Sequence, residues 1–127
     1  MRKLVVNLIL MMTLAACHPS GKEVAGKYYT KHNKGTEYIE LFENGTFIHY
    51  FKNDTVDYKE EGTWGFETRM SQERFFLSGY VEYVAPMEDG VNPWGKPGHV
   101  SGYWESDLIS FHGDGYDEYN FHREKKE

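Results

Sequence analysis

The sequence is poor in cysteine, in proline and in long apolar runs. Cys17 is its only cysteine, so the chain forms no internal disulfide and its fold must rest on its core. Three of its four prolines lie between residues 86 and 97, which leaves the rest of the chain open to strand formation. No apolar run approaches the roughly 20 residues that a membrane-spanning helix needs. These absences exclude a disulfide-stapled scaffold and offer no candidate for a spanning helix.

The chain also lacks the short motifs of common catalytic sites. It contains no Gly-x-Ser-x-Gly, no His-Glu-x-x-His, no P-loop and no dinucleotide fingerprint. Its six histidines are not spaced like zinc ligands, and its acidic residues do not form an EF-hand loop. We therefore expect no enzyme activity, no cofactor and no metal, and we assign no catalytic residue.

The N-terminus carries the pattern of an export signal. Arg2 and Lys3 precede an apolar stretch that ends in LAAC (14–17). A basic start, a short apolar segment and small residues before a cleavage point are typical of a secretory signal peptide. The last four residues resemble the lipobox of bacterial lipoproteins, which implies cleavage before Cys17 and acylation of that residue. The next residue is His18 rather than the aspartate that retains many lipoproteins in the inner membrane, so an outer-membrane location is favoured.

The mature chain that this processing would leave is acidic. Loss of Arg2 and Lys3 leaves 12 Lys and Arg against 20 Asp and Glu, a net charge of −8. That charge argues against nucleic acid as a partner and against a second, electrostatic hold on anionic lipid. We predict a signal peptide over 1–16, a lipidated N-terminus with a short tether over 17–25, and one folded domain over 26–127, anchored in a bacterial cell envelope. The oligomeric state stays open.

Aromatic residues are plentiful where aliphatic ones are scarce. All 21 Phe, Tyr and Trp follow residue 16, against 12 Val, Ile and Leu in the same part of the chain. Such residues suit a pleated, half-buried surface, and short apolar segments alternate here with turn signals. The pattern predicts an all-β sandwich or small barrel of about eight strands. The expected strands are 26–31, 37–42, 46–52, 55–66 with a bulge or bend at Gly62, 74–84, 100–105, 107–111 and 116–123.

Asn44-Gly45 is the clearest hairpin signal in the chain. A two-residue turn would pair Leu41 with Ile48, whereas a three-residue turn with Gly45 left-handed would pair Leu41 with Phe47. A slip of one residue turns every side chain of one strand to the other face. We favour the three-residue turn because it gathers one set of side chains on one face: Ile39, Leu41, Phe47, His49 and Phe51.

Several segments resemble small bacterial lipocalin-like lipoproteins. The segment YIELFENGTFIHYF (38–51) is similar to the hairpin of that family, and GKYY (26–29) lies where the family opens with a Gly-x-Trp/Tyr strand. EGTW (61–64), DLISF (107–111) and YNFHR (119–123) are similar to later strands. The resemblance implies a single up-and-down antiparallel β-barrel with a possible internal cavity, but it implies no particular ligand. Tyr28, where tryptophan is commoner, and a long insertion over 84–99 depart from the pattern.

That insertion, VAPMEDGVNPWGKPGH, is predicted to be a loop because of its prolines and glycines. Loops of this length are often functional. Trp94 lies inside it and is a candidate for stacking on a sugar, covering the barrel mouth or anchoring a partner protein. The alternative is that Trp94 folds back as a plug over the open barrel end.

His49 is the second candidate binding residue. On the favoured register it points into the barrel, where an imidazole would hydrogen-bond a ligand. The alternative is an ordinary core histidine whose hydrogen bonds are satisfied by the protein.

Two functions remain open at this stage. The first is a binding module that holds a small apolar or amphipathic ligand in a cavity of about 300 Å³ or more. The second is a non-enzymatic interaction protein whose barrel is filled by its aromatic side chains and which presents the 84–99 loop to an envelope protein or a glycan. A barrel of about eight strands is wide enough for either outcome.

Overall fold

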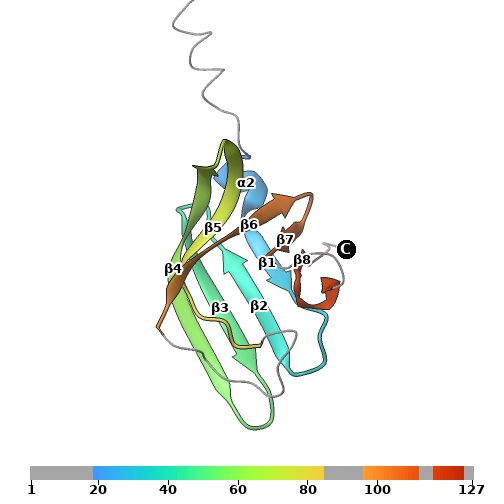
Figure 1. Cartoon of the computed structure of the whole chain (residues 1–127). Coiled ribbons are helices and arrows are strands. Elements are labelled where there is room, and N and C mark those ends of the chain that lie inside the picture. The colour runs from blue at the N-terminus through green and yellow to red at the C-terminus, as the bar shows by residue number, and fades with distance from the viewer. Residues whose placement is uncertain (1–18, 85–95, 112–115, 125–127) are drawn as a thin grey trace, which may run out of the picture.

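Turn residues divide the chain into eight strands that close into a barrel. The computed structural model describes residues 19–84, 96–111 and 116–124. Its elements are α2 (Gly21–Val24), β1 (Gly26–Tyr29), β2 (Thr36–Leu41), β3 (Thr46–Lys52), β4 (Asp57–Arg69), β5 (Gln72–Tyr80), β6 (Gly98–Glu105), β7 (Leu108–Ser110), the 3₁₀ turn η1 (Asp117–Tyr119) and β8 (Phe121–Arg123). Each strand pairs antiparallel with the next, and β8 pairs with β1 (Figure 1). The predicted all-β, up-and-down antiparallel barrel is confirmed.

The β2–β3 hairpin has the register that the sequence favours. Leu41 pairs with Phe47, and Gly45 adopts a left-handed φ of 87°. The inward face of the two strands is buried, as expected: Ile39, Leu41, Phe47, His49 and Phe51. The Asn44 side chain accepts a hydrogen bond from the Thr46 backbone N–H at 3.1 Å, which explains why this turn forms locally.

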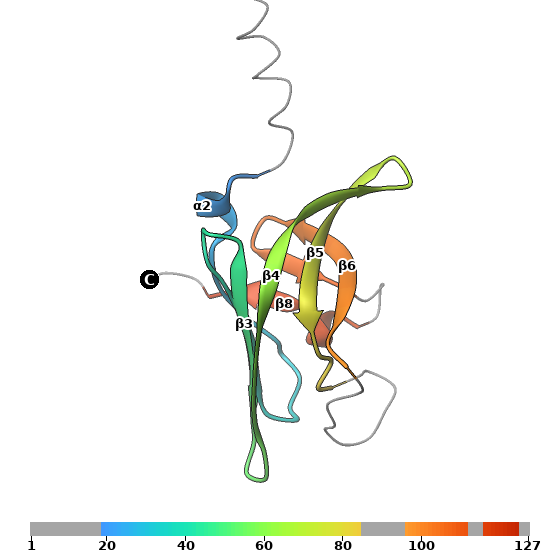
Figure 2. The ribbon, with the colours of Figure 1, turned by 90° about the vertical axis from the view of Figure 1, so that its left-hand side faces the viewer.

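The barrel has two different ends. We call the end that carries α2, the β2–β3 turn and the β4–β5 turn the capped end, and the opposite end, with the β3–β4 turn, the open end. Figure 2 shows α2 over the first and the long β4–β5 hairpin extending past the barrel on the same side. Val24 of α2 is fully buried and so closes the capped end.

A group of hydrogen bonds at the capped end holds the first and last strands together. The Tyr28 hydroxyl group donates to the Val24 carbonyl and accepts from Arg123 Nη2 and, at 2.9 Å, from Trp104 Nε1. The Arg123 guanidinium lies 5.0 Å from the centroid of the Tyr28 ring and donates to the Glu23 carbonyl at 2.7 Å. One node therefore joins α2, β1, β6 and β8.

The interior is filled mainly by aromatic side chains in two clusters. The larger one is made of Val24, Tyr28, Ile39, Leu41, Phe47, Trp64, Phe75, Leu77, Ile109 and Phe121. The smaller one lies toward the open end and is made of Phe51, Val81, Tyr83, Val84 and Tyr119. At about 25 cal/mol per Å² of apolar surface removed from water, burial of these rings is the main stabilising contribution in a chain without disulfides.

Two sequence predictions about strands need correction. The expected strand over 116–123 is in its first half the 3₁₀ turn η1, whose end is fixed by hydrogen bonds from Asn120 to Asp117. The register shift lies in β5 between Ser78 and Tyr80, not at Gly62, which pairs regularly with Phe47. The next residue, Thr63, pairs with both Thr46 of β3 and Ser78 of β5, so β4 changes its partner strand there.

Candidate functional site

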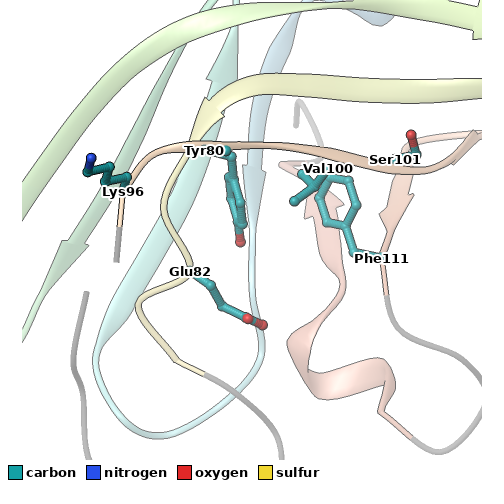
Figure 3. Close-up of a pocket in the computed structure, with 7 residues that line it drawn as sticks. Tyr80, Glu82, Lys96, Val100, Ser101 and Phe111 are labelled. Atoms are coloured by element: carbon teal, nitrogen blue, oxygen red, sulfur yellow. The ribbon is translucent and has the colours of Figure 1, made fainter. Parts of the chain in front are cut away.

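The open end of the barrel contains a pocket of about 440 Å³. Its lining residues are Tyr80, Glu82, Lys96, Gly98, Val100, Ser101 and Phe111. In Figure 3 the rings of Tyr80 and Phe111 and the side chain of Val100 lie next to one another, and the Glu82 carboxylate is directed beneath them. Lys96 extends away from this group (Figure 3). The pocket thus combines the apolar surface of Tyr80, Val100 and Phe111 with the polar side chains of Glu82, Lys96 and Ser101.

A β-bulge places Tyr80 in this pocket. Phe75 and Leu77 face the core, so regular alternation would turn residue 79 inward next. That residue is Gly79, with φ of 90°, and the register of β5 against β6 shifts there. The extra residue brings Tyr80 inward instead.

The opposite wall depends on a second glycine. Gly102 lies on the inward face of β6, and a Cβ atom there would be 2.6 Å from Phe111 Cδ1 and 2.3 Å from the Ser110 carbonyl oxygen. Only glycine leaves room for the Phe111 ring at this point. The ring centroid of Phe111 then lies 5.7 Å from that of Tyr80, within the range of favourable aromatic contacts.

Behind Tyr80 lies a buried His–Glu–His cluster, formed by His32, Glu37 and His49. His32 Nε2 is 2.7 Å from Glu37 Oε1, and His49 Nε2 is 2.6 Å from Glu37 Oε2. Glu37 is 4 % exposed and His49 is fully buried. A carboxylate that is removed from water in this way needs such partners.

The hydrogen bonds identify which ring nitrogen carries the proton. The Lys34 backbone N–H donates to His32 Nδ1 at 3.2 Å, so His32 carries its proton on Nε2 and donates to Glu37. His49 likewise directs Nε2 at the carboxylate. Its Nδ1 atom is buried and has no hydrogen-bond partner in the described part of the chain. The hydroxyl oxygen of Tyr83 is buried and unpartnered in the same sense.

The His49 ring lies between two tyrosines. Its centroid is 4.7 Å from that of Tyr80, with the planes at 10°, and 4.3 Å from that of Tyr83, with the planes at 24°. Two rings cannot stack on one face of an imidazole, so they lie on opposite faces. Tyr80 therefore contacts Phe111 in the pocket and His49 in the core, and it links the pocket to the buried cluster.

Burial and charge set the protonation states of these groups. Burial raises the pKa of the Tyr80 phenol well above its usual range, and the carboxylates of Glu37 and Glu82 raise it further. Tyr80 is therefore a neutral O–H donor at physiological pH. Burial also tends to raise the pKa of Glu37, but hydrogen bonds from His32 and His49 outweigh it and lower that pKa below the ordinary value. Glu37 is therefore ionised at physiological pH.

This lowered pKa predicts a loss of stability in acid. Glu37 stabilises the fold fully above the ordinary carboxyl pKa of 4.5, and the stabilisation disappears as the pH falls from there through the folded-state pKa. We expect the free energy of unfolding, measured by urea denaturation across this range, to fall more steeply for the wild type than for Glu37→Gln. Parallel curves for the two proteins would contradict the assignment.

A second polar group lies on the outer face of the barrel. His99 Nε2 is 2.9 Å from Glu67 Oε1, and the Ser101 hydroxyl donates to the same oxygen at 2.6 Å. Because the serine gives its proton to a carboxylate rather than to the histidine, the group lacks the order of a nucleophile and its base. It connects β4 to β6 across β5.

The structure places one of the three residues singled out from the sequence. His49 is inside the barrel, as predicted. Its Nε2 atom has a hydrogen-bond partner, and its Nδ1 atom has none in the described part of the chain. Cys17 and Trp94 lie outside the described residues, as does most of the predicted 84–99 loop. Among residues 19–84, 96–111 and 116–124, no group of three or more His, Cys, Asp or Glu side chains is placed to hold a metal ion.

Sequence reasoning missed Glu37, Tyr80, Glu82 and Phe111. A signal for Glu37 was present, because the register that turns Ile39 and Leu41 inward also turns Glu37 inward. A carboxylate on a core face is stable only with buried hydrogen-bond or charge partners, so its position predicts such partners. The other three depend on the bulge at Gly79 and on loops, which periodicity does not specify.

Comparisons with known proteins identify no relative of this chain. No helix within the described ranges is long and apolar enough to cross a membrane. The chain matches no protein-family model, no curated protein and no solved structure. Its closed eight-stranded antiparallel barrel is compatible with a lipocalin-like fold.

Proposed function

We propose that this chain is a non-enzymatic binding protein that holds a small amphipathic ligand at the open end of its barrel. The observation that carries this proposal is the pocket of about 440 Å³ with aromatic walls. Its size lies within the range of ligand sites, which are mostly apolar with a few polar groups that fix orientation. Another hollow, of about 640 Å³, lies at the capped end, but its described lining is largely charged and contains no aromatic side chain.

The chemistry of the walls favours a ligand with both apolar and polar parts. Tyr80, Val100 and Phe111 provide apolar surface. Tyr80 also provides a neutral hydroxyl donor, and Glu82 provides a carboxylate next to it. An apolar ligand body packed on the rings, with a hydrogen-bonding group near Tyr80 and Glu82, would use all of these groups.

The location of the protein is part of the proposal. The lipobox-like LAAC (14–17) supports acylation of Cys17 and attachment to a bacterial envelope membrane, with the outer membrane favoured by His18. Several acyl chains on one residue give a stable anchor. The resemblance of the strand segments to lipocalin-like lipoproteins supports the same assignment.

A second function is favoured by the way in which the barrel is filled. The two aromatic clusters occupy the interior, so the pocket lies at the mouth and does not run the length of the barrel. A filled barrel would serve as a rigid support for the 84–99 segment and its Trp94, with an envelope protein or a glycan as the partner.

Native mass spectrometry after exposure to an extract of the cell envelope distinguishes the two functions. A discrete small-molecule adduct that is lost on denaturation is the result expected for the ligand carrier. An unliganded mass, under conditions in which a known lipocalin retains its ligand, would favour the filled support and direct the search to partners of Trp94.

Substitution at Gly98 tests the pocket directly. A Cβ atom at Gly98 meets nothing within 4 Å, and the position lines the pocket, so Gly98→Leu should fill part of it without strain. We expect binding of the neutral amphipathic dye N-phenyl-1-naphthylamine to weaken about tenfold or more, which corresponds to about 1.4 kcal/mol. Thermal stability should stay unchanged.

Gly98→Ala is the matched control. It adds one methyl group to the same open position and should leave dye binding close to that of the wild type. If Gly98→Leu binds the dye as tightly as Gly98→Ala does, the dye lies elsewhere and the pocket assignment is wrong.

A further inference from the structure

The exposed large apolar side chains of the described residues gather at the capped end. Met70 is 97 % exposed and Tyr103 is 49 % exposed, and these are the two such residues in the described ranges. Met70 lies at the tip of the β4–β5 hairpin, and Tyr103 lies near the end of β6. Arg74 of β5 connects the hairpin to β6, since its Nη2 donates to the Tyr103 hydroxyl group at 2.9 Å.

Met70 also has an unfavourable backbone conformation for its type. Met70 has φ of 51° and Ser71 has φ of 63°, in a turn that normally takes asparagine and glycine. Left-handed geometry is unfavourable at a non-glycine residue, because Cβ comes too close to the following carbonyl oxygen. Local stability therefore does not explain a methionine here, and neither does packing, because almost none of its surface is buried.

The start of the folded chain lies at the same end. Pro19 is the first described residue and leads directly into α2, which is held on the barrel by Val24 and by Arg123. Cys17 precedes Pro19 by two residues, a span of at most about 7 Å at 3.3–3.6 Å per residue. An acylated Cys17 would therefore hold Pro19, at the capped end, within about 7 Å of the anchored residue.

We propose that the capped end faces the membrane and that the β4–β5 hairpin tip contacts the lipid surface through Met70. Figure 2 shows this hairpin extending past the barrel on the side of α2. Tyr103 suits the membrane–water interface, where tyrosine is enriched. Arg69 and Arg74 stand beside the tip, where lipid phosphates would be, although Glu67, which interacts with Arg69, and Glu73 offset much of their charge.

This orientation has a consequence for the pocket. The β3–β4 turn lies at the open end, opposite α2 (Figures 1 and 2). Gly98 begins β6 and Glu82 follows the end of β5, so both lie at that end too. The mouth therefore opens away from the bilayer, and a ligand enters it from the aqueous phase rather than from the anchoring membrane. The inference rests on the acylation of Cys17 that forms part of the proposed function.

A dye that reports polarity tests the orientation. Met70→Cys and, as the matched control at the open end, Asp54→Cys would each be labelled with a solvatochromic maleimide on the full acylated protein. The labelled proteins would then be bound to vesicles of phosphatidylethanolamine with a minority of phosphatidylglycerol. We expect the emission maximum at position 70 to shift to shorter wavelength on vesicle binding, and that at position 54 to stay unchanged.

The outcomes separate the orientation from the anchor. Equal emission from the two positions on vesicles, with the protein bound, would overturn the orientation and leave the anchor standing. Wild-type protein should take up no dye, because acylation leaves Cys17 without a free thiol. Dye uptake by the wild type, or its failure to float with vesicles, would overturn the anchor and this orientation together, whereas dye binding in the pocket is measured independently.

Discussion

Replacing Glu37 with glutamine should lower the free energy of unfolding by about 2–4 kcal/mol. Two histidine N–H groups point at the two carboxylate oxygens, at 2.7 and 2.6 Å. Glutamine keeps one oxygen and presents an amide NH₂ group to the other histidine. That group either faces a second donor or moves the His49 proton to Nδ1, so that a buried N–H group is left without an acceptor in both cases. Since small domains are stable by only about 5–15 kcal/mol, the loss would be large. Urea denaturation near neutral pH measures it.

Glu40→Gln is the control for this substitution. Glu40 lies on the same strand as Glu37 but faces outward, paired with Ile48, and it is half-buried rather than buried. Its replacement should change stability by no more than about 0.5 kcal/mol, as is usual for surface positions. Equal stability of the two variants would show that the buried cluster contributes nothing net to folding.

The Glu37 variant also separates structure from binding. If the cluster is only a core element, Glu37→Gln should destabilise the fold but leave the affinity for an amphipathic dye unchanged. A loss of affinity beyond the loss of folded protein would indicate that the cluster positions Tyr80, which stacks on His49.

The sequence determines some parts of this molecule locally and leaves others to the tertiary fold. The β2–β3 register follows from Asn44-Gly45 and from alternation, and it places His49 and Glu37 inside. The pocket does not follow in this way, because it needs the bulge at Gly79, the gap at Gly102 and the return of Phe111 after β7. Each of these depends on contacts between segments that are distant in the sequence.

Two further elements show the same division. Ser20 caps α2 by accepting from the Glu23 N–H at 3.2 Å, yet four residues have too little helical periodicity to be recognised within the predicted tether. His32 lies in the loop between β1 and β2, where no alternation exists to indicate which way it points. Its hydrogen bond to Glu37 depends on the tertiary fold and has no signal in the local sequence.

Replacing Tyr28 with phenylalanine should destabilise the protein by about 2–4 kcal/mol with almost no change in packing volume. Its hydroxyl group serves the Val24 carbonyl, Trp104 Nε1 and Arg123 Nη2 in a fully buried position. Phenylalanine would leave the indole N–H of Trp104 without this acceptor and remove one of the contacts that hold Arg123. The measurement is again the free energy of unfolding in urea.

Tyr29→Phe is the matched control, because Tyr29 is the next residue of β1 and faces outward, where its ring contacts Tyr38 at 5.4 Å. The same chemical change there should have an effect of no more than about 0.5 kcal/mol. Hydrogen exchange adds a local test: in Tyr28→Phe the amide hydrogen of Ala25, which bonds to the Gly21 carbonyl at 2.8 Å, should exchange faster than global unfolding allows. Unchanged protection of α2 would mean that Val24 alone holds the helix. Its loss would show that the hydrogen bonds between Tyr28, Arg123 and α2 fix the start of the folded chain to the barrel.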